Sequence, residues 1–148
     1  MEATVRSKLG TLSGSVTSVI KKAPPVKRTI TAVMPCLNEE ETIGICIKKA
    51  LTSFKAMGIN GEIIVSDNGS TDKSVEIAES LGAKVVHQPV KGYGAALQRG
   101  IEAATGDIIV MADSDDSYDW SQMEQFIRKI HKGFDLVMGN RFKGGIQP

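Results

Sequence analysis

Several features that mark large classes of protein are scarce or missing in this sequence of 148 residues. It has two cysteines, Cys36 and Cys46, and two histidines, and none of them stands at the spacing of a zinc site or a disulfide framework. A reducing, cytoplasmic compartment is therefore expected. No apolar run approaches the roughly 18 residues that a membrane span needs, and the N-terminus lacks the apolar core of a secretory signal.

Charge of one sign is not in excess either. The formal net charge is +1 at pH 7, so bulk attraction gives no reason to expect a nucleic-acid partner. What is present is an ordinary globular composition, with 41% hydrophobic and 24% charged residues. The length corresponds to one domain.

Residues 1–28 are rich in Ser, Thr, Lys and Arg and show no sustained periodicity. They are predicted to form a flexible basic leader, which is either an unstructured tail or a peripheral contact to anionic lipid headgroups. The folded domain is expected to cover residues 29–148. Because the chain stops soon after its fifth predicted strand, this domain is expected to be incomplete at its C-terminus.

Short apolar runs alternate with amphipathic segments from residue 29 onward. The runs predict strands at 30–34, 62–66, 84–87, 108–112 and 136–138, and the segments predict helices at 38–56, 71–81, 92–104 and 120–131. Asn38 is the expected cap of the first helix. Alternating strands and helices imply right-handed βαβ units, so the predicted fold class is α/β, with a mostly parallel sheet flanked by helices.

The predicted strand 108–112 runs straight into a cluster of carboxylates, Asp113, Asp115, Asp116 and Asp119. Ligands of open α/β sheets bind just beyond the carboxyl ends of such strands. Crowded carboxylates repel one another unless a cation compensates, and Mg²⁺ and Mn²⁺ prefer oxygen ligands. The cluster therefore predicts a metal-dependent phosphate site. The alternative is that Asp116 or Asp119 caps the next helix and the other acids are solvated.

Polar residues also follow the first two predicted strands. Pro35, Asn38 and Glu39 follow the first strand, where a nucleoside could lie, although a helix cap and acids that complement the helix dipole would explain them too. Asp67 follows the second strand and could accept hydrogen bonds from a base or ribose. The residues after it would suit any strand-turn-helix connection.

Two further candidates lie near later strands. Lys91 and Gly92 open the helix predicted at 92–104 and would let an anion approach its N-terminus, although packing explains them equally well. Leu97 stands where a dinucleotide fingerprint needs its third glycine, so that fingerprint is incomplete. A dehydrogenase module is disfavoured because the first strand leads to Pro-Cys-Leu-Asn and not to a glycine-rich turn. Arg141 follows the fifth strand and is either a bidentate clamp for a diphosphate or a surface arginine.

Taken in order, five short motifs resemble those of family 2 glycosyltransferases with the Rossmann-like GT-A fold. They lie at 35–39, 67–72, 92–96, 113–115 and 139–142. Within that family, the sequence looks most like polyprenyl-phosphate sugar transferases of the dolichol-phosphate mannosyltransferase type. The resemblance covers residues 29–145.

The resemblance implies roles for individual residues. Asp113-Ser114-Asp115 matches the Asp-x-Asp motif, which makes Asp115 the expected metal ligand and Asp113 its support; Arg141 would bind donor phosphate. The expected catalytic residues are therefore Asp113, Asp115 and Arg141, and the expected metal ligands are Asp113 and Asp115. The expected nucleotide-binding residues are Pro35, Asn38, Glu39, Asp67, Lys91, Gly92 and Ser114.

The implied activity is an inverting transfer that uses Mg²⁺ or Mn²⁺. It would move a sugar from a UDP- or GDP-linked donor to a polyprenyl phosphate, at the cytoplasmic face of a membrane. A lipid phosphate with a second pKa of about 6 is already a nucleophile at neutral pH and needs no general base. The alternatives are a saccharide acceptor, which would need such a base, and a nucleotide-binding fragment without catalysis.

Overall fold

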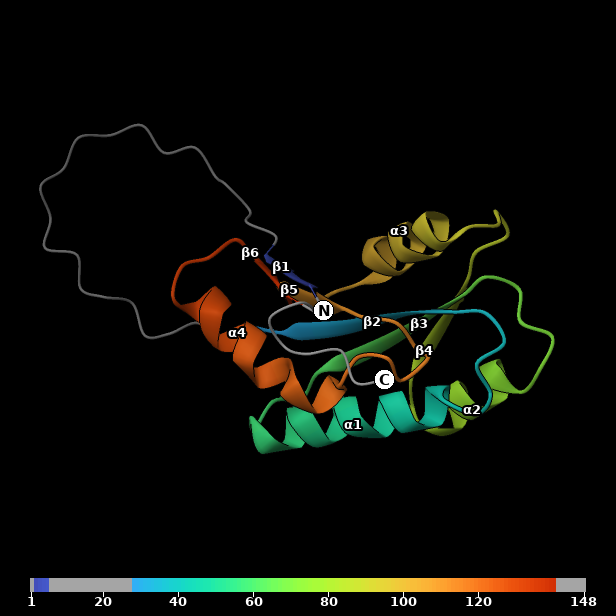
Figure 1. Ribbon diagram of the computed structural model, residues 1–148, viewed down its shortest axis with the longest axis horizontal. Helices are drawn as coiled ribbons and strands as arrows, with labels where there is room; N and C mark the ends of the chain where they lie inside the picture. Colours follow the sequence, from blue (N-terminus) through green and yellow to red (C-terminus); the bar gives the residue numbers. More distant parts are fainter. Residues whose placement is uncertain (1, 6–27, 141–148) are drawn as a thin grey trace, which may run out of the picture.

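A computed structural model describes residues 2–5 and 28–140 (Figure 1). In these ranges the chain forms one six-stranded sheet of order β4-β3-β2-β5-β1-β6. The strands are β1 (Glu2–Val5), β2 (Ile30–Cys36), β3 (Glu62–Asp67), β4 (Lys84–His87), β5 (Ile108–Met111) and β6 (Leu136–Met138). The helices are α1 (Ile43–Ala56), α2 (Ser74–Ser80), α3 (Tyr93–Ala103) and α4 (Met123–His131), with a short 3₁₀ helix, η1 (Trp120–Gln122).

Strands β4, β3, β2 and β5 are parallel, which confirms the predicted α/β class. The chain passes from β2 to β3 and β4 on one side of β2, and later returns to β5 on its other side. The strand order therefore reverses at β2. In open α/β sheets, such a reversal leaves a crevice at the carboxyl ends of the strands, and ligands bind there.

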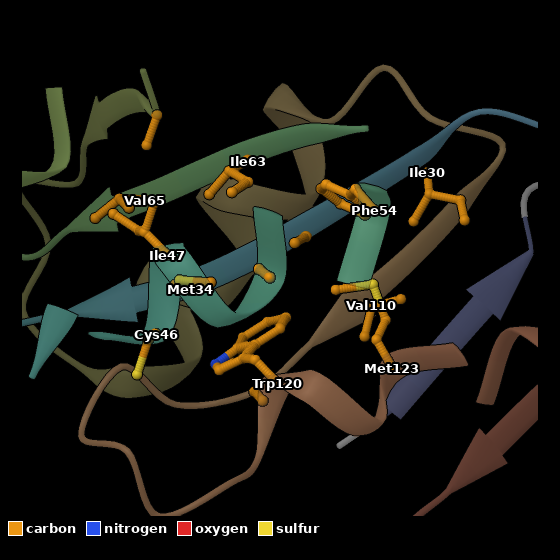
Figure 2. Close-up of a cluster of buried hydrophobic side chains, with 14 of the residues drawn as sticks. Ile30, Met34, Cys46, Ile47, Phe54, Ile63, Val65, Val110, Trp120 and Met123 are labelled. Atoms are coloured by element: carbon orange, nitrogen blue, oxygen red, sulfur yellow. The ribbon is translucent and has the colours of Figure 1, made fainter. Parts of the chain in front are cut away.

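Helices cover both faces of the sheet. Helices α1, α2 and α4 lie on one face and α3 lies on the other (Figure 1). The side chains of successive β2 residues pack on opposite faces of the sheet. Met34 belongs to the larger core cluster, with α1, and Val33 belongs to the smaller cluster beneath α3. Figure 2 shows the larger cluster, where Trp120 lies among buried side chains of β2, α1 and β5. None of the helices in the described ranges is both long and apolar enough to cross a membrane.

Residues 2–5 correct the predicted leader. They form β1, which pairs antiparallel with both β5 and β6. Four residues are too few for an alternating pattern to stand out in the sequence, and the partner strands lie far along the chain. The rest of the predicted leader, residues 6–27, lies outside the described residues.

The predicted end of the first strand and the predicted start of the first helix were both wrong. The strand continues through Pro35 to Cys36, although proline cannot donate to a strand ladder. The Pro35 carbonyl faces the β5 side, where it accepts from Ser114 Oγ at 2.7 Å. The β2–β5 ladder has already ended at Val33 and Met111, so the missing N–H removes no ladder bond.

The first helix begins at Ile43 rather than near Asn38. Asn38 has a φ of 57°, and its side-chain oxygen accepts from the backbone N–H of Thr71 at 2.8 Å. It therefore ties two loops together and does not cap α1. Asparagine tolerates this left-handed conformation better than most residues do.

Candidate functional site

A cavity of about 290 Å³ opens at the carboxyl ends of β2 and β5. Pro35 and Cys36, at the end of β2, and Leu37 and Glu39, which follow it, line one side of the cavity. Residues 113–115, which follow β5, line another. Asn68, after β3, and Tyr93 and Ala96, from α3, complete the lining. The cavity therefore lies where the reversal of strand order predicts a ligand.

The four carboxylates after β5 have different surroundings. Asp113 and Asp115 line the cavity. Asp116 forms an ion pair with Lys49 at 2.7 Å. Asp119 accepts from the backbone N–H and the hydroxyl of Ser121, and these bonds lower the pKa of its carboxyl. Asp119 therefore caps η1, as the alternative interpretation expects, and Asp116 is paired within the protein. Asp113 and Asp115 line the cavity, and a metal site there stays a prediction.

One face of α1 holds this acidic loop in place. The Cys46 thiol donates to the carbonyl oxygen of Ser114 at 3.4 Å, and the Ser53 hydroxyl donates to the carbonyl of Trp120 at 2.9 Å. Lys49, which pairs with Asp116, lies between them on the helix. Cys46, Lys49 and Ser53 share a face because their spacing follows the helical period. The loop therefore has its shape before any ligand binds.

Ser114 joins the ends of β2 and β5. It is buried, and its hydroxyl donates to the Pro35 carbonyl at 2.7 Å. It lines the cavity, and its side chain is used in this bond within the protein. The bond holds residues 113 and 115 at a fixed distance from the end of β2, so Ser114 organises the site.

Tyr93 and Asn68 line the cavity and were missed among the predicted site residues. The Tyr93 hydroxyl donates to Asp113 Oδ1 at 2.7 Å. An aromatic residue between two glycines at the start of a helix was the available signal for Tyr93. Asn68 gave no signal, because an Asn-Gly pair after a strand is expected in any turn.

Asp67 is buried and lies outside the cavity lining. Its carboxylate accepts from the backbone N–H groups of Gly69 and Ser70, at 3.1 and 3.0 Å, and lies 3.2 Å from His87 Nδ1. Burial raises the pKa of this carboxyl, but hydrogen bonds from Ser70, His87 and Gly69 outweigh burial and lower it. Asp67 shapes the turn after β3.

Asn38 and Glu39 belong to a segment that is bound to the start of α2. The backbone N–H of Asn38 donates to Ser70 Oγ at 2.9 Å, and that of Glu39 donates to Ser74 Oγ at 2.7 Å. Of these two predicted site residues, only Glu39 lines the cavity. Its carboxylate accepts from Thr42 Oγ1 at 2.9 Å.

Lys91 and Gly92 stand just outside the cavity lining and bond to Asn68. Lys91 Nζ donates to the Asn68 carbonyl at 2.7 Å, and the Gly92 N–H donates to Asn68 Oδ1 at 2.8 Å. Gly92 has a φ of 134°, which disfavours any residue with a side chain. The loop before α3 is thereby fixed to the end of β3.

A divalent cation fits the carboxylates of the cavity only in combination with a ligand. Within the described ranges no group of three His, Cys, Asp or Glu residues could hold a metal ion. Asp113 and Asp115 supply two neighbouring carboxylates at the cavity, and Glu39 lines it from the β2 side. Mg²⁺ is commonly bound by one or two carboxylates together with substrate phosphates, which this arrangement suits. Arg141, the predicted phosphate ligand, lies outside the described residues.

The chain is similar to several known proteins. It is 40% identical over 121 residues to the low-salt glycan biosynthesis hexosyltransferase Agl6 of Haloferax volcanii, covering 81% of this chain and 29% of that protein. It is 31% identical over 118 residues to a dolichyl-phosphate hexose transferase of the same organism, covering 80% of this chain and 50% of that protein.

A solved structure supports the expected GT-A fold. It is the glucosyl-3-phosphoglycerate synthase of Mycobacterium tuberculosis in complex with Mn²⁺, UDP-glucose and phosphoglyceric acid. It is 38% identical to this chain, with a TM-score of 0.51 over 60% of this chain and 33% of that one.

The chain spans half or less of each of these three proteins. A model of the family described as glycosyl transferase family 2 matches residues 31–148, which include all five motifs singled out in the sequence. The strand order, the cavity at the carboxyl edge and these similarities agree with one another: the chain belongs to glycosyl transferase family 2.

Proposed function

We propose that this chain binds the nucleotide-sugar donor of an inverting, metal-dependent glycosyltransferase. The observation that carries the proposal is the difference in surroundings among the four carboxylates after β5. The charge of Asp116 is paired with Lys49 and the carboxylate of Asp119 caps η1, whereas Asp113 and Asp115 line the cavity with no cationic side chain paired to either in the described part of the chain. Two carboxylates beside an open cavity suit a diphosphate with a divalent cation.

The residues of the cavity divide between the two ends of a nucleoside diphosphate sugar. Pro35, Leu37 and Glu39 offer apolar surface and a carboxylate acceptor, which suit a base and ribose. Asp113 and Asp115 would hold Mg²⁺ or Mn²⁺, which when bound neutralises the charge that develops on the departing diphosphate. The M. tuberculosis synthase, crystallised with Mn²⁺ and UDP-glucose, supports a UDP-linked donor, and a GDP-linked donor is the alternative.

The proposed acceptor is a polyprenyl phosphate at the cytoplasmic face of a membrane. A phosphate monoester is ionised at neutral pH and attacks without a general base. The similarity to a dolichyl-phosphate hexose transferase supports this acceptor class.

A hydroxyl acceptor, such as a saccharide or a hydroxy acid, is the second candidate. The similarity to a synthase crystallised with phosphoglyceric acid favours it. A hydroxyl needs a general base, so transfer should slow as that base is protonated. A rate that does not change between about pH 6.5 and 8.5 would instead support the phosphate acceptor.

Calorimetric titration tests the donor site directly. UDP and GDP are titrated into the chain with Mn²⁺, with Mg²⁺ and with a chelator. We expect one nucleotide to bind in a metal-dependent manner. Asp115→Asn should lower the metal-dependent affinity by roughly tenfold or more. Mutating residues that only hydrogen-bond to a metal ligand already lowers metal affinity by about that factor.

Asp116→Asn is the matched control for this titration. It makes the same chemical change in the same loop, and asparagine also tolerates the φ of 60° at this position. It should leave the metal dependence unchanged, because the Asp116 carboxylate is paired with Lys49. Equal losses in the two variants, or no metal-dependent binding to the folded wild-type chain, would overturn the donor site.

A further inference from the structure

Tyr93 connects two sides of the cavity that come from distant parts of the chain. It is the first residue of α3, and its hydroxyl donates to Asp113 Oδ1, beyond the end of β5, at 2.7 Å. The residue is 60% exposed although it lines the cavity. Burial in the core therefore does not explain its presence here.

We propose that Tyr93 is a positioning residue that holds the Asp113 carboxylate toward the cavity for metal-dependent binding of the nucleoside diphosphate. The inference rests on the proposed function and adds a residue to it. A phenol supplies one O–H donor, whereas a carboxylate has about four acceptor sites on its two oxygens. The bond can therefore fix the orientation of Asp113 and still leave acceptor sites for a cation or a ribose.

Tyr93 is itself held in place by Asn68. The buried Asn68 side chain donates to the carbonyls of Gln88 and Val90, at 2.9 and 2.8 Å, and accepts from the Gly92 N–H at 2.8 Å. Both amide hydrogens and the amide oxygen are thus used within one loop. The loop cannot shift without breaking buried hydrogen bonds, so the first residue of α3 has a defined position.

The backbone of Asp113 is fixed independently from the opposite side. The indole N–H of Trp120, which is fully buried, donates to the Asp113 carbonyl at 3.2 Å. The next residue, Ser114, is bonded to Pro35. With its backbone held, Asp113 still has side-chain rotation to lose on binding a ligand. A bond from Tyr93 removes that freedom beforehand, and such preorganisation raises affinity.

Tyr93→Phe tests the inference because it removes the hydroxyl and keeps the ring. We expect the affinity for the nucleotide with Mn²⁺ to fall roughly 10- to 100-fold, the range for loss of a hydrogen bond to a charged group. The affinity measured with a chelator should not change. Tyr118→Phe is the matched control: the chain has two tyrosines, and Tyr118 packs against the core outside the cavity lining.

A double-mutant cycle shows whether Tyr93 acts through Asp113. In an Asp113→Asn background, adding Tyr93→Phe should cost little further affinity for the nucleotide, because the carboxylate that it positions is gone. The chain has one tryptophan, and Mn²⁺ quenching of Trp120 fluorescence gives a second measurement of cation binding beside Asp113. Quenching should require more Mn²⁺ in Tyr93→Phe than in the wild type.

The outcomes separate this inference from the proposed function. Wild-type metal dependence in Tyr93→Phe would overturn the role of Tyr93 and leave the donor site standing. An equal loss of nucleotide affinity with and without metal would have the same meaning. So would a Tyr93→Phe effect on affinity that is as large in the Asp113→Asn background as in the wild type. If the wild-type chain binds neither UDP nor GDP with Mn²⁺, the proposed function fails and this inference fails with it.

Discussion

Lys49 is a residue whose effect on the acidic loop can be measured by itself. It pairs with Asp116 at 2.7 Å, with side chains 36% and 30% exposed, and hydrogen bonding to Asp116 raises the pKa of Lys49. Lys49→Met should lower the free energy of unfolding by less than about 1 kcal/mol, because partly exposed ion pairs contribute little. Urea denaturation at low and high salt measures the loss, which should shrink as salt screens the pair.

Lys48→Met is the control for this substitution. Lys48 is exposed on the same helix, and the change removes the same charge. It should leave the stability nearly unchanged at both salt concentrations. If the two variants behave alike, the ion pair between Lys49 and Asp116 does not stabilise the loop.

Asp67 makes the stability of the fold depend on pH in the acidic range. The pKa of its carboxyl is lowered in the folded state, where hydrogen bonds outweigh the opposing effect of burial. The stability that its ionised form contributes is present above the unfolded pKa, about 3.9, and is lost as the pH falls through the lower folded pKa. Asp67→Asn should therefore destabilise most at neutral pH and least in acid.

Unfolding free energies of the wild type and Asp67→Asn between pH 7 and pH 3 check this expectation. Exposed Asp135→Asn controls for the loss of one negative charge. If the difference in unfolding free energy between wild type and Asp67→Asn is the same at every pH, the amide destabilises by disturbing packing. The charge of Asp67 would then not contribute to stability.

At the scale of elements, α3 can lie against the sheet because Gly100 has no side chain. An added Cβ would overlap Val33 Cγ1 of β2. Gly100→Ala should destabilise by about 1–3 kcal/mol, as overpacking does, although alanine raises helix propensity by about 1 kcal/mol. Thermal or urea unfolding measures the net loss.

Gly94→Ala separates packing from propensity in the same helix. A Cβ at Gly94 would meet nothing within 4 Å, and its φ is not positive. This variant should be neutral or slightly more stable. Destabilisation of both variants by the same amount would exclude the overlap with Val33 as the cause.

The parallel elements were predictable from the sequence because each carries its own periodic pattern. The runs that became β2, β3, β4, β5 and β6 and the four helices were all expected. The end of β2 was missed because Pro35 normally stops a strand, and only the finished ladder reveals that its N–H is not needed. The start of α1 was missed because Asn38 bonds to Thr71, a contact that depends on tertiary structure.

The candidate site was predictable to a similar extent. Placing Asp113 and Asp115 beyond a buried strand followed from the sequence, and both line the cavity. The compensation of Asp116 was not predictable, since Lys49 approaches it from another element. The roles of Asp67 and Asn68 in holding turns depend on where neighbouring loops pass, and local sequence does not encode those positions.

At the scale of the whole molecule, β1 joins the edge strand β6 to the rest of the sheet. It lies between β5 and β6 and pairs with both, so these strands do not touch each other directly. Removing residues 1–5 would leave backbone groups of β5 and β6 without partners. Buried backbone groups that lose their hydrogen bonds are costly, so the β5 and β6 end of the sheet should open more easily.

Hydrogen exchange measures that opening residue by residue. In a chain without residues 1–5, amides of β5 and β6 should exchange faster than in the wild type. Amides of β3 provide the internal control, because β3 is separated from β1 by β2 and β5. Faster exchange throughout the sheet would mean that β1 supports the whole domain. Unchanged exchange in β5 would mean that β1 does not pair there in solution, and the Asp113 loop that follows β5 would then owe its shape to its bonds with α1, Trp120, Pro35 and Tyr93 and not to β1.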